Sequence, residues 1–362
     1  MIGVTQEKSM IIVDAHQDIA WVSIKTGRDY RISALKHRQN EVGQNTSAAT
    51  IGLPDSLLGR VAFIFATLFA APAKNSRAVQ LSGGMAYRDA KEAYTIAMRQ
   101  VDYYQRLNDE EERIHLIRSA EDIDIVLETW QDGTELHQRK QGLVILMEGA
   151  DPILEPKQFE EWYERGVRIV GTAWGETRYS GGTGAPGGLS FLGNDLLDVL
   201  AGYHAILDLS HMAEQSFYEA LDRYEGVIIA SHSNPRRFCD TDRHLSDDMI
   251  RRLAERDGVM GVVLYNKFLK RTWSKGTARL PLSIAADVID HVCQITGSAA
   301  HVGIGSDFDG GFGAESIPEE IETSGDLLEI AQILRERGYE ASDIEAIMGG
   351  NMLRKLRESL TT

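Results

Sequence analysis

Short runs of apolar and β-branched residues, each bounded by turn-forming residues, recur along the whole chain. Runs that are apolar on both faces are typical of strands buried in a parallel sheet. The segments between them carry apolar residues at helical spacing, as in 86–108 and 212–224. The pattern predicts eight strands, at residues 10–18, 60–70, 143–151, 167–174, 204–211, 226–233, 258–265 and 301–310.

This alternation of eight strands with helices predicts an α/β fold, a (β/α)8 TIM barrel formed by a single domain over residues 1–362. A doubly wound sheet is the alternative, but it would usually carry a glycine-rich phosphate-binding turn after its first strand. Two helices are expected at the C-terminal end, at about 325–360. A glycine-rich stretch at about 175–193 follows the fourth strand, so we expect a loop at the active-site face.

Ionisable residues stand at the ends of the predicted strands. In the first run, "IIVDAHQDIAW", Asp14, His16 and Asp18 are two residues apart and therefore share one face. Three charges on an inner face are costly unless a metal neutralises them; the alternative is a strand end that passes into a polar loop. Later strands end in further residues of this kind, namely Glu148, His211, His232, Asp307 and Asp309.

The carboxyl ends of barrel strands meet at one mouth, so these side chains are expected to surround one cavity. Imidazole and carboxylate ligands suit zinc, and also manganese, iron or cobalt. They are too many for one tetrahedral zinc, whereas two metals could share Glu148 as a bridge. One metal would take His16 and Asp18, and the other His211 and His232. Two such metals would hold a bridging hydroxide, which predicts hydrolysis of a polarised bond.

Six sequence blocks, in this order, resemble those of the membrane dipeptidase (renal dipeptidase-like) family of zinc metallopeptidases. The blocks are "DAHQD", "EGAD", "LDLSHM", "ASHSNPRRFCDTDRHLSDD", "HVGIGSDFDGG" and "GGNMLR", and the resemblance covers nearly the whole chain. It implies a (β/α)8 barrel that binds two Zn²⁺ ions per chain, cleaves dipeptides and forms homodimers.

The resemblance also implies roles for individual residues. A guanidinium fits the carboxylate of a substrate, and an aspartate beside two cations can move a proton from the nucleophile to the leaving amine. The implied metal ligands are His16, Asp18, Glu148, His211 and His232, the implied catalytic residues are Asp307 and Glu148, and the implied carboxylate-binding residue is Arg243.

One position departs from the family pattern. The family generally has a histidine after a threonine near the end of the fourth strand, whereas here Thr172 is followed by Ala173. Losing one oxyanion donor typically costs about a hundredfold to a thousandfold in rate. Either another group substitutes, or the substrate is an N-acyl amino acid or another small amide or lactone, or the protein is a weakly active homologue. The further candidates for substrate contact are Trp174, Arg178 and Asn266.

Charge and composition narrow the possible partners. A net charge of −16 disfavours binding to nucleic acid or to anionic membranes. No apolar run approaches the length of a membrane span, and residues 1–10 lack the apolar core of a signal peptide. Two cysteines, Cys239 and Cys293, do not form a disulfide framework. We therefore expect a cytoplasmic enzyme with a small dipeptide-like substrate and no nucleic-acid or membrane partner.

Overall fold

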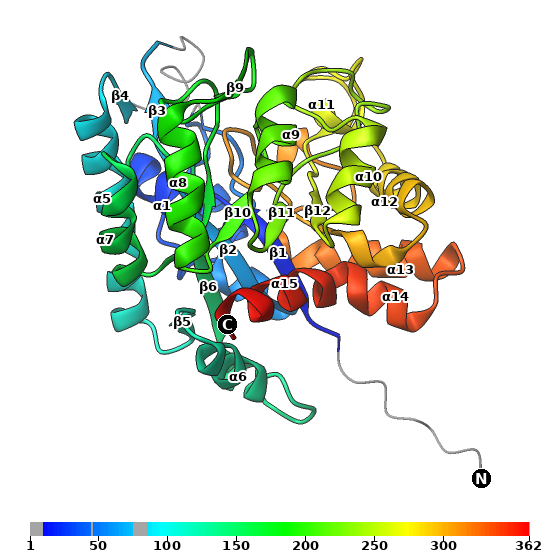
Figure 1. Ribbon diagram of the computed structural model, residues 1–362. Coiled ribbons are helices and arrows are strands. Elements are labelled where there is room, and N and C mark those ends of the chain that lie inside the picture. Colours follow the sequence, from blue (N-terminus) through cyan, green and yellow to red (C-terminus); the bar gives the residue numbers. More distant parts are fainter. Residues whose placement is uncertain (1–9, 45, 75–84, 362) are drawn as a thin grey trace.

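Eight parallel strands close into a barrel in the computed structural model, which describes residues 10–44, 46–74 and 85–361 (Figure 1). The barrel is closed because β2 pairs with β6 as well as with β1, so the predicted (β/α)8 fold is confirmed. Residues 1–9, which carry most of the expectation about a signal peptide, lie outside the described residues. The strands around the barrel are β1 (Ile12–Gln17), β2 (Val61–Phe69), β6 (Gln141–Glu148), β7 (Val167–Gly171), β10 (Ile206–Asp208), β11 (Ile228–Ala230), β12 (Val259–Val262) and β13 (Val302–Ile304).

Seven of the strands fall within the runs predicted from the sequence, β6 begins two residues before its run, and all eight end earlier than predicted. The first ends at Gln17, and Asp18 already occupies the position before helix α1 (Ile19–Thr26). A further strand, β5 (Ile114–Leu116), pairs with the start of β6 and was not predicted. His115 interrupts its three residues, so the segment lacks the continuous apolar run by which the barrel strands were predicted.

The glycine-rich stretch after β7 contains a β-hairpin. Its strands are β8 (Ser180–Gly182) and β9 (Ala185–Leu189), which pair antiparallel. A second small sheet joins β3 (Ala71–Pro72) to β4 (Ala86–Tyr87). The loop predicted at about 175–193 is therefore an ordered arm over the mouth of the barrel.

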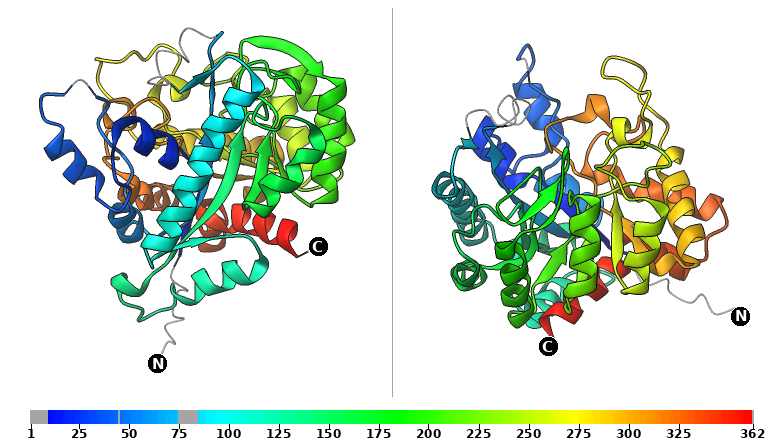
Figure 2. Two further views of the ribbon diagram at one scale, coloured as in Figure 1. Left: turned by 90° about the vertical axis from the view of Figure 1, so that its left-hand side faces the viewer. Right: turned by 45° about the horizontal axis from the view of Figure 1, so that its top comes forward.

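Helices surround the barrel and also cross its lower end (Figure 2). Helix α15 lies beneath the barrel, at the end where β1 begins, and contacts β1, β10, β12 and β13 (Figure 1). Among the described helices, none combines the length and apolar character needed to cross a membrane. The remaining helices are α2 (Ala34–Asn40), α3 (Leu53–Leu58), α5 (Ala90–Glu110), α6 (Ala120–Glu128), α7 (Phe159–Glu164), α8 (Phe191–Gly202), α9 (Glu214–Arg223), α10 (Asp247–Glu255), α11 (Asn266–Leu269), α12 (Ser283–Thr296), α13 (Leu328–Glu336), α14 (Ala341–Glu345) and α15 (Asn351–Leu360).

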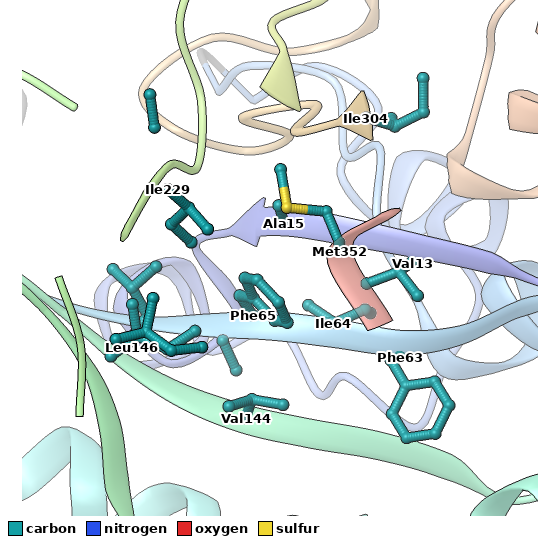
Figure 3. Close-up of a cluster of buried hydrophobic side chains, with 14 of the residues drawn as sticks. Val13, Ala15, Phe63, Ile64, Phe65, Val144, Leu146, Ile229, Ile304 and Met352 are labelled. Atoms are coloured by element: carbon teal, nitrogen blue, oxygen red, sulfur yellow. The ribbon is translucent and has the colours of Figure 1, made fainter. Parts of the chain in front are cut away.

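The apolar core holds the strands against one another and against α15. Figure 3 shows Val13 and Ala15 of β1 beside Phe65 of β2, Leu146 of β6 and Met352 of α15. All five side chains are almost completely buried, so their removal from water stabilises the barrel and the helix beneath it together. This packing gives the polar upper ends of the strands a rigid base.

Two glycines let the end of β11 lie unusually close to its neighbours. A Cβ atom added to Gly261, in β12, would lie 1.9 Å from the carbonyl oxygen of Ser231, and a Cβ atom added to Gly305, after β13, would lie at the same distance. Any larger residue would therefore push Ser231 away. The two glycines form a slot that fixes the position of Ser231, and with it that of the following residue, His232.

Candidate metal centre and substrate cavity

The structure brings the five predicted metal ligands together at the mouth of the barrel. Glu148 lies among them: its Oε1 is 3.0 Å from His211 Nε2 and 3.2 Å from His232 Nε2. Its other oxygen, Oε2, lies 3.8 Å from His16 Nε2. Each oxygen of one carboxylate thus faces a different set of histidines, which is the arrangement expected of a shared ligand.

A second set of donor atoms surrounds His16. Its Nε2 lies 3.7 Å from Asp18 Oδ2 and 3.8 Å from Asp307 Oδ1. Both ring nitrogens of His16 are buried and have no hydrogen-bond partner among the described residues. Donor atoms fall within 4.8 Å of one another in two groups, one formed by His16, Glu148 and His232 and one by His16, Asp18 and Asp307. Buried nitrogen and oxygen donors in this arrangement, with both His16 nitrogens unpartnered, fit a divalent metal centre.

Burial keeps the histidines of this cluster uncharged, so the lone pairs on their ring nitrogens are available to a cation. It lowers the pKa of His16, His211 and His232 well below the ordinary value, and the charge of Arg243 lowers them further. The imidazoles are therefore uncharged and can act as ligands. Burial also raises the pKa of Glu148, and the nearby aspartates add to this effect.

The aspartates of the cluster are shifted in the same direction. Burial raises the pKa of Asp18 to about 7, against the opposing hydrogen bond from Thr67 Oγ1 at 2.7 Å. Burial and the charge of Asp18 raise the pKa of Asp307 well above its usual value. Like charges held this close are unfavourable on their own, and a bound cation would reverse the balance by stabilising the ionised carboxylates.

Two of the clustered residues have a strained backbone. His211 has φ of 67° and Asp307 has φ of 62°, both in the left-handed region that residues with a Cβ rarely occupy. Such strain costs of the order of 1–3 kcal/mol and persists only where the surroundings enforce it. Each residue stands three positions after the end of a barrel strand, so this conformation is part of how the chain turns into the mouth of the barrel.

His232 is supported from inside the barrel. Its Nδ1 lies 2.8 Å from Ser231 Oγ, and Ser231 Oγ donates to Asp208 Oδ2 at 2.5 Å. Asp208 Oδ1 also accepts from the backbone N–H groups of Ser231 and Ser210. Because the single hydroxyl hydrogen goes to Asp208, Ser231 can only accept from His232. The imidazole then carries its proton on Nδ1 and leaves Nε2 free for a metal.

His211 is supported from the β8–β9 hairpin. Thr183, at the tip of the hairpin, places its Oγ1 3.1 Å from His211 Nδ1. The next residue, Gly184, donates its backbone N–H to Asp242 Oδ2 at 2.7 Å. The tip therefore joins a candidate metal ligand on one side to the loop that carries Arg243 on the other.

Arg243 lies at the cavity, as predicted for a carboxylate-binding residue. Its Nη2 donates to the carbonyl oxygen of His232 at 2.7 Å and its Nη1 to Ser233 Oγ at 3.3 Å. Its Nε is buried without a partner among the described residues. The guanidinium is thus anchored but retains donor capacity toward the cavity that it lines.

A cavity of about 510 Å³ opens directly above the clustered donors. Asp18, Glu148, His211 and Asp307 contribute to its lining together with Arg243. Its volume is in the range of ordinary small-molecule sites. Aromatic side chains form much of the rest of the wall, and they are Trp21, Phe69, Trp174, Tyr265, Phe268 and Phe312.

The structure places Ala173 beside the hairpin. Its side chain is 1% exposed and does not line the cavity. It faces the hairpin instead, because a Cβ atom added to Gly182 would lie 3.0 Å from Ala173 Cβ. The residue that reaches the cavity after the fourth strand is Trp174, whose ring centroid lies 5.9 Å from that of His211. The indole of Trp174 therefore forms this side of the pocket.

Arg178 and Asn266 do not line the cavity, in contrast to our expectation of substrate contact. Arg178 donates to the carbonyl oxygens of Asp151, Ile153 and Leu154 and to the Asp151 carboxylate, so its guanidinium holds that loop. Asn266 is fully buried and donates its side-chain amide to a backbone carbonyl oxygen 3.0 Å away. The two polar groups serve the packing of loops, which sequence position alone does not reveal.

Several residues of the site were missed by sequence reasoning. Asp208 had a usable signal, because an aspartate inside an apolar strand requires buried partners. Trp21 also had one, because it lies three residues after Asp18 and therefore one helical turn further on. Thr183 had none, since its contact depends on the fold of the hairpin.

Comparison with known families supports the sequence resemblance. The family model described as membrane dipeptidase (peptidase family M19) matches residues 5–361. A protein of Klebsiella pneumoniae, described as an uncharacterized protein in the pqqA 5' region, is 30% identical over 56% of this chain and 76% of its own length. Dipeptidase 3 of Rattus norvegicus is 27% identical over 74% of this chain, which spans only 53% of that protein.

Solved structures share the fold. A crystal structure described as dipeptidase AC, a family M19 metallopeptidase, has a TM-score of 0.78 with 20% identity, covering 98% of this chain and 99% of that one. A metallopeptidase of Rhodobacter sphaeroides, liganded with a phosphinate mimic of the dipeptide L-Ala-D-Ala, also has a TM-score of 0.78 with 20% identity, covering 97% and 99%. These similarities establish the barrel architecture over essentially the whole chain.

Proposed function

The chain belongs to the membrane dipeptidase family of metallopeptidases, peptidase family M19, and from that premise we propose that it hydrolyses the peptide bond of dipeptides at a centre of two divalent metals. The observation that carries the proposal is the position of Glu148. One of its oxygens faces His211 and His232, and the other faces His16. Two sets of ligands that share a carboxylate are the basis of a two-metal hydrolytic site.

The ligands divide into two sets. His16, Asp18 and Glu148 would hold one ion, and Glu148, His211 and His232 the other, with zinc the expected metal. When bound, the ions supply an acidified water molecule and positive charge for the scissile carbonyl oxygen. The buried, neutral imidazoles and the unpartnered nitrogens of His16 support this assignment.

Residues of the chain itself position the substrate and move protons. Arg243, which lines the cavity, binds the terminal carboxylate of the dipeptide. Asp307, with Oδ1 3.8 Å from His16 Nε2, accepts a proton from the attacking water and passes it to the leaving amine nitrogen. Trp174 covers the side of the cavity next to His211 and excludes water from it.

The experiment compares substrates that differ in one group. Purified protein should carry about two divalent metals per chain, and a chelator should abolish hydrolysis. Dipeptides with a free C-terminus should be cleaved much faster than the same dipeptides with an amidated C-terminus. Arg243→Lys keeps the charge but loses the two-pronged contact, so it should reduce this discrimination.

Two outcomes would change the proposal. Equal rates on free and amidated dipeptides would remove the role of Arg243. Faster cleavage of N-acyl amino acids than of dipeptides would assign the same site to a related amidohydrolase. Homodimer formation, a cytoplasmic location and a single domain over residues 1–362 remain predictions, which light scattering, fractionation and limited proteolysis can test.

A further inference from the structure

Three aromatic side chains form one side of the cavity, and we call Trp21, Phe69 and Trp174 the aromatic wall. Trp21 lies in α1, directly after β1, Phe69 ends β2, and Trp174 follows β7. The strand order around the barrel places β1, β2, β6 and β7 side by side. The aromatic wall therefore belongs to one half of the barrel mouth.

The rings of the aromatic wall contact one another and hold fixed positions. Trp21 and Phe69 pack edge to face with ring centroids 5.9 Å apart, and Phe69 and Trp174 pack with centroids 5.2 Å apart. Lys25 Nζ lies 4.3 Å from the Trp21 ring centroid. Such contacts favour a rigid surface, so a ligand would meet a preformed apolar wall and would not have to order it.

The aromatic wall borders the clustered donors directly. Phe69 is the register partner of Glu148 across the β2–β6 pair. Trp174 lies with its ring centroid 5.9 Å from that of His211. Any group bound against the wall is therefore adjacent to the bond that the proposed reaction breaks.

The carboxylate-binding end lies on the other half of the mouth. Arg243 follows β11, and its guanidinium carbon lies 5.6 Å from the ring centroid of Phe268, which follows β12. A dipeptide with its carboxylate at Arg243 and its peptide bond at Glu148 directs its N-terminal residue away from β11 and β12. That direction leads to the aromatic wall.

We propose that the enzyme selects dipeptides whose N-terminal residue has a large aromatic side chain, which packs against Trp21, Phe69 and Trp174. The inference rests on the proposed dipeptidase function. An aromatic side chain removes the most apolar surface from water at such a wall and pairs with its rings at favourable angles. A glycine or alanine in the same place leaves water against the rings.

The first test is a panel of dipeptides assayed with the metal-loaded enzyme. The series Gly-Ala, Ala-Ala, Leu-Ala, Phe-Ala and Trp-Ala varies only the N-terminal residue. We expect kcat/KM to rise along the series by about tenfold to a hundredfold between Gly-Ala and Phe-Ala. The reversed series, from Ala-Gly to Ala-Phe, controls for side-chain size as such and should show a smaller rise.

The outcomes separate the inference from its premise. Measurable hydrolysis with equal kcat/KM across the N-terminal series would overturn the aromatic preference and leave the dipeptidase function standing. No hydrolysis of any dipeptide by enzyme with full metal content would overturn the proposed function, and this inference with it.

A pair of variants locates the preference. Trp174→Ala should lower the ratio of kcat/KM for Phe-Ala over Gly-Ala by about tenfold, because it removes one ring of the wall. Phe312→Ala is the matched control. Phe312 also lines the cavity, but it lies in the opposite half of the barrel mouth, where its ring stacks on that of Tyr265 with the ring centroids 4.4 Å apart. The Phe312→Ala variant should leave the ratio of kcat/KM for Phe-Ala over Gly-Ala unchanged. Trp174→Leu, which retains apolar volume, should give an intermediate ratio and covers the case in which the alanine variant fails to fold. Unchanged ratios in the Trp174 variants would overturn the assignment.

Discussion

His211 and His232 lie side by side, with their Nε2 atoms 3.1 Å apart, yet their other ring nitrogens are held from different regions of the molecule. His232 is held from the barrel interior, through Ser231 and Asp208. His211 is held from the hairpin tip, through Thr183. Two proposed ligands of one centre thus have two kinds of support.

The interior support is part of the core, whereas the hairpin support is an addition to it. Asp208 and Ser231 are 2% and 0% exposed, and their strands are neighbours in the barrel. Thr183 is only partly buried and belongs to an arm that α9 holds, for example through Ser216 Oγ, which donates to the carbonyl oxygen of Gly187 at 2.7 Å. The interior thus holds one proposed ligand, whereas the other is contacted by an arm whose Thr183 also lines the cavity.

The largest effect on metal content and activity is expected at Glu148, whose carboxylate lies against both His211 and His232. Glu148→Gln alters the carboxylate that faces His211, His232 and His16, so metal content should fall at both positions and activity by more than about a hundredfold. Elemental analysis together with a dipeptide assay measures both. Glu160→Gln, on the exposed surface of α7, is the control and should behave as native. Full metal content in Glu148→Gln would show that the shared carboxylate is misassigned.

The interior support is tested by Asp208→Asn. The new amide can donate to Ser231, which would then donate to His232 Nδ1 and move the ring proton to Nε2, where a metal must bind. We expect metal affinity to fall by about tenfold to a hundredfold, measured by chelator competition.

Asp14→Asn is the matched control for this change. Asp14 is equally buried and accepts from Ser306 Oγ at 2.6 Å, but its hydrogen bonds within the described part of the chain include none to an imidazole nitrogen. Its substitution should lower stability with a smaller change in metal affinity. Equal losses in the two variants would mean that the ring-proton argument is wrong.

The hairpin support should matter less. Thr183→Val keeps the shape but removes the hydroxyl near His211 Nδ1, and water can reach this partly exposed position. A loss of about twofold to tenfold in metal affinity corresponds to one hydrogen bond of this kind. Thr183→Ser should restore it, because the hydroxyl returns. If serine fails to rescue, the methyl packing of Thr183 and not its hydrogen bond is what matters.

The smallest effect on chemistry is expected at the base of the arm. Ala173→His forces a ring into the contact between Ala173 and Gly182. The free energy of unfolding should fall by about 1–3 kcal/mol, measured by denaturant titration of the metal-loaded protein. Activity should change no more than in Thr183→Val. A gain in kcat on simple dipeptides with unchanged stability would mean that this position does face the substrate.

The barrel could be predicted from the sequence because its strands are buried on both faces. A run such as Val61–Phe69 is apolar except for Thr67, and all nine residues are buried. The hairpin was predicted only as a loop, because its strands contain Gly181, Gly182, Gly187 and Gly188 and so show no alternation of apolar and polar residues. Strand ends were placed too late where polar ligands, such as Asp18, continue an apolar run.

The sequence predicted that the proposed ligands would come together, but it did not predict the residues that support them. His16, Glu148 and His232 each follow an apolar run, and barrel topology alone brings such positions together. The contact between Thr183 and His211 joins residues 28 apart in sequence and depends on how the arm folds back. In the same way, Arg178 could not be assigned to its loop, because its partners there are mostly backbone carbonyl oxygens, which every residue has.

The glycine slot around Ser231 has a consequence for how the gene can vary. Gly261 and Gly305 touch no substrate, yet a single added methyl group at either would collide with the residue that precedes His232. In a library of all single substitutions, selected for growth on a dipeptide as sole source of an amino acid, both codons should be nearly as depleted of variants as the codon of His232. A map of tolerance along the chain would therefore mark two positions with no chemistry of their own as part of the active site.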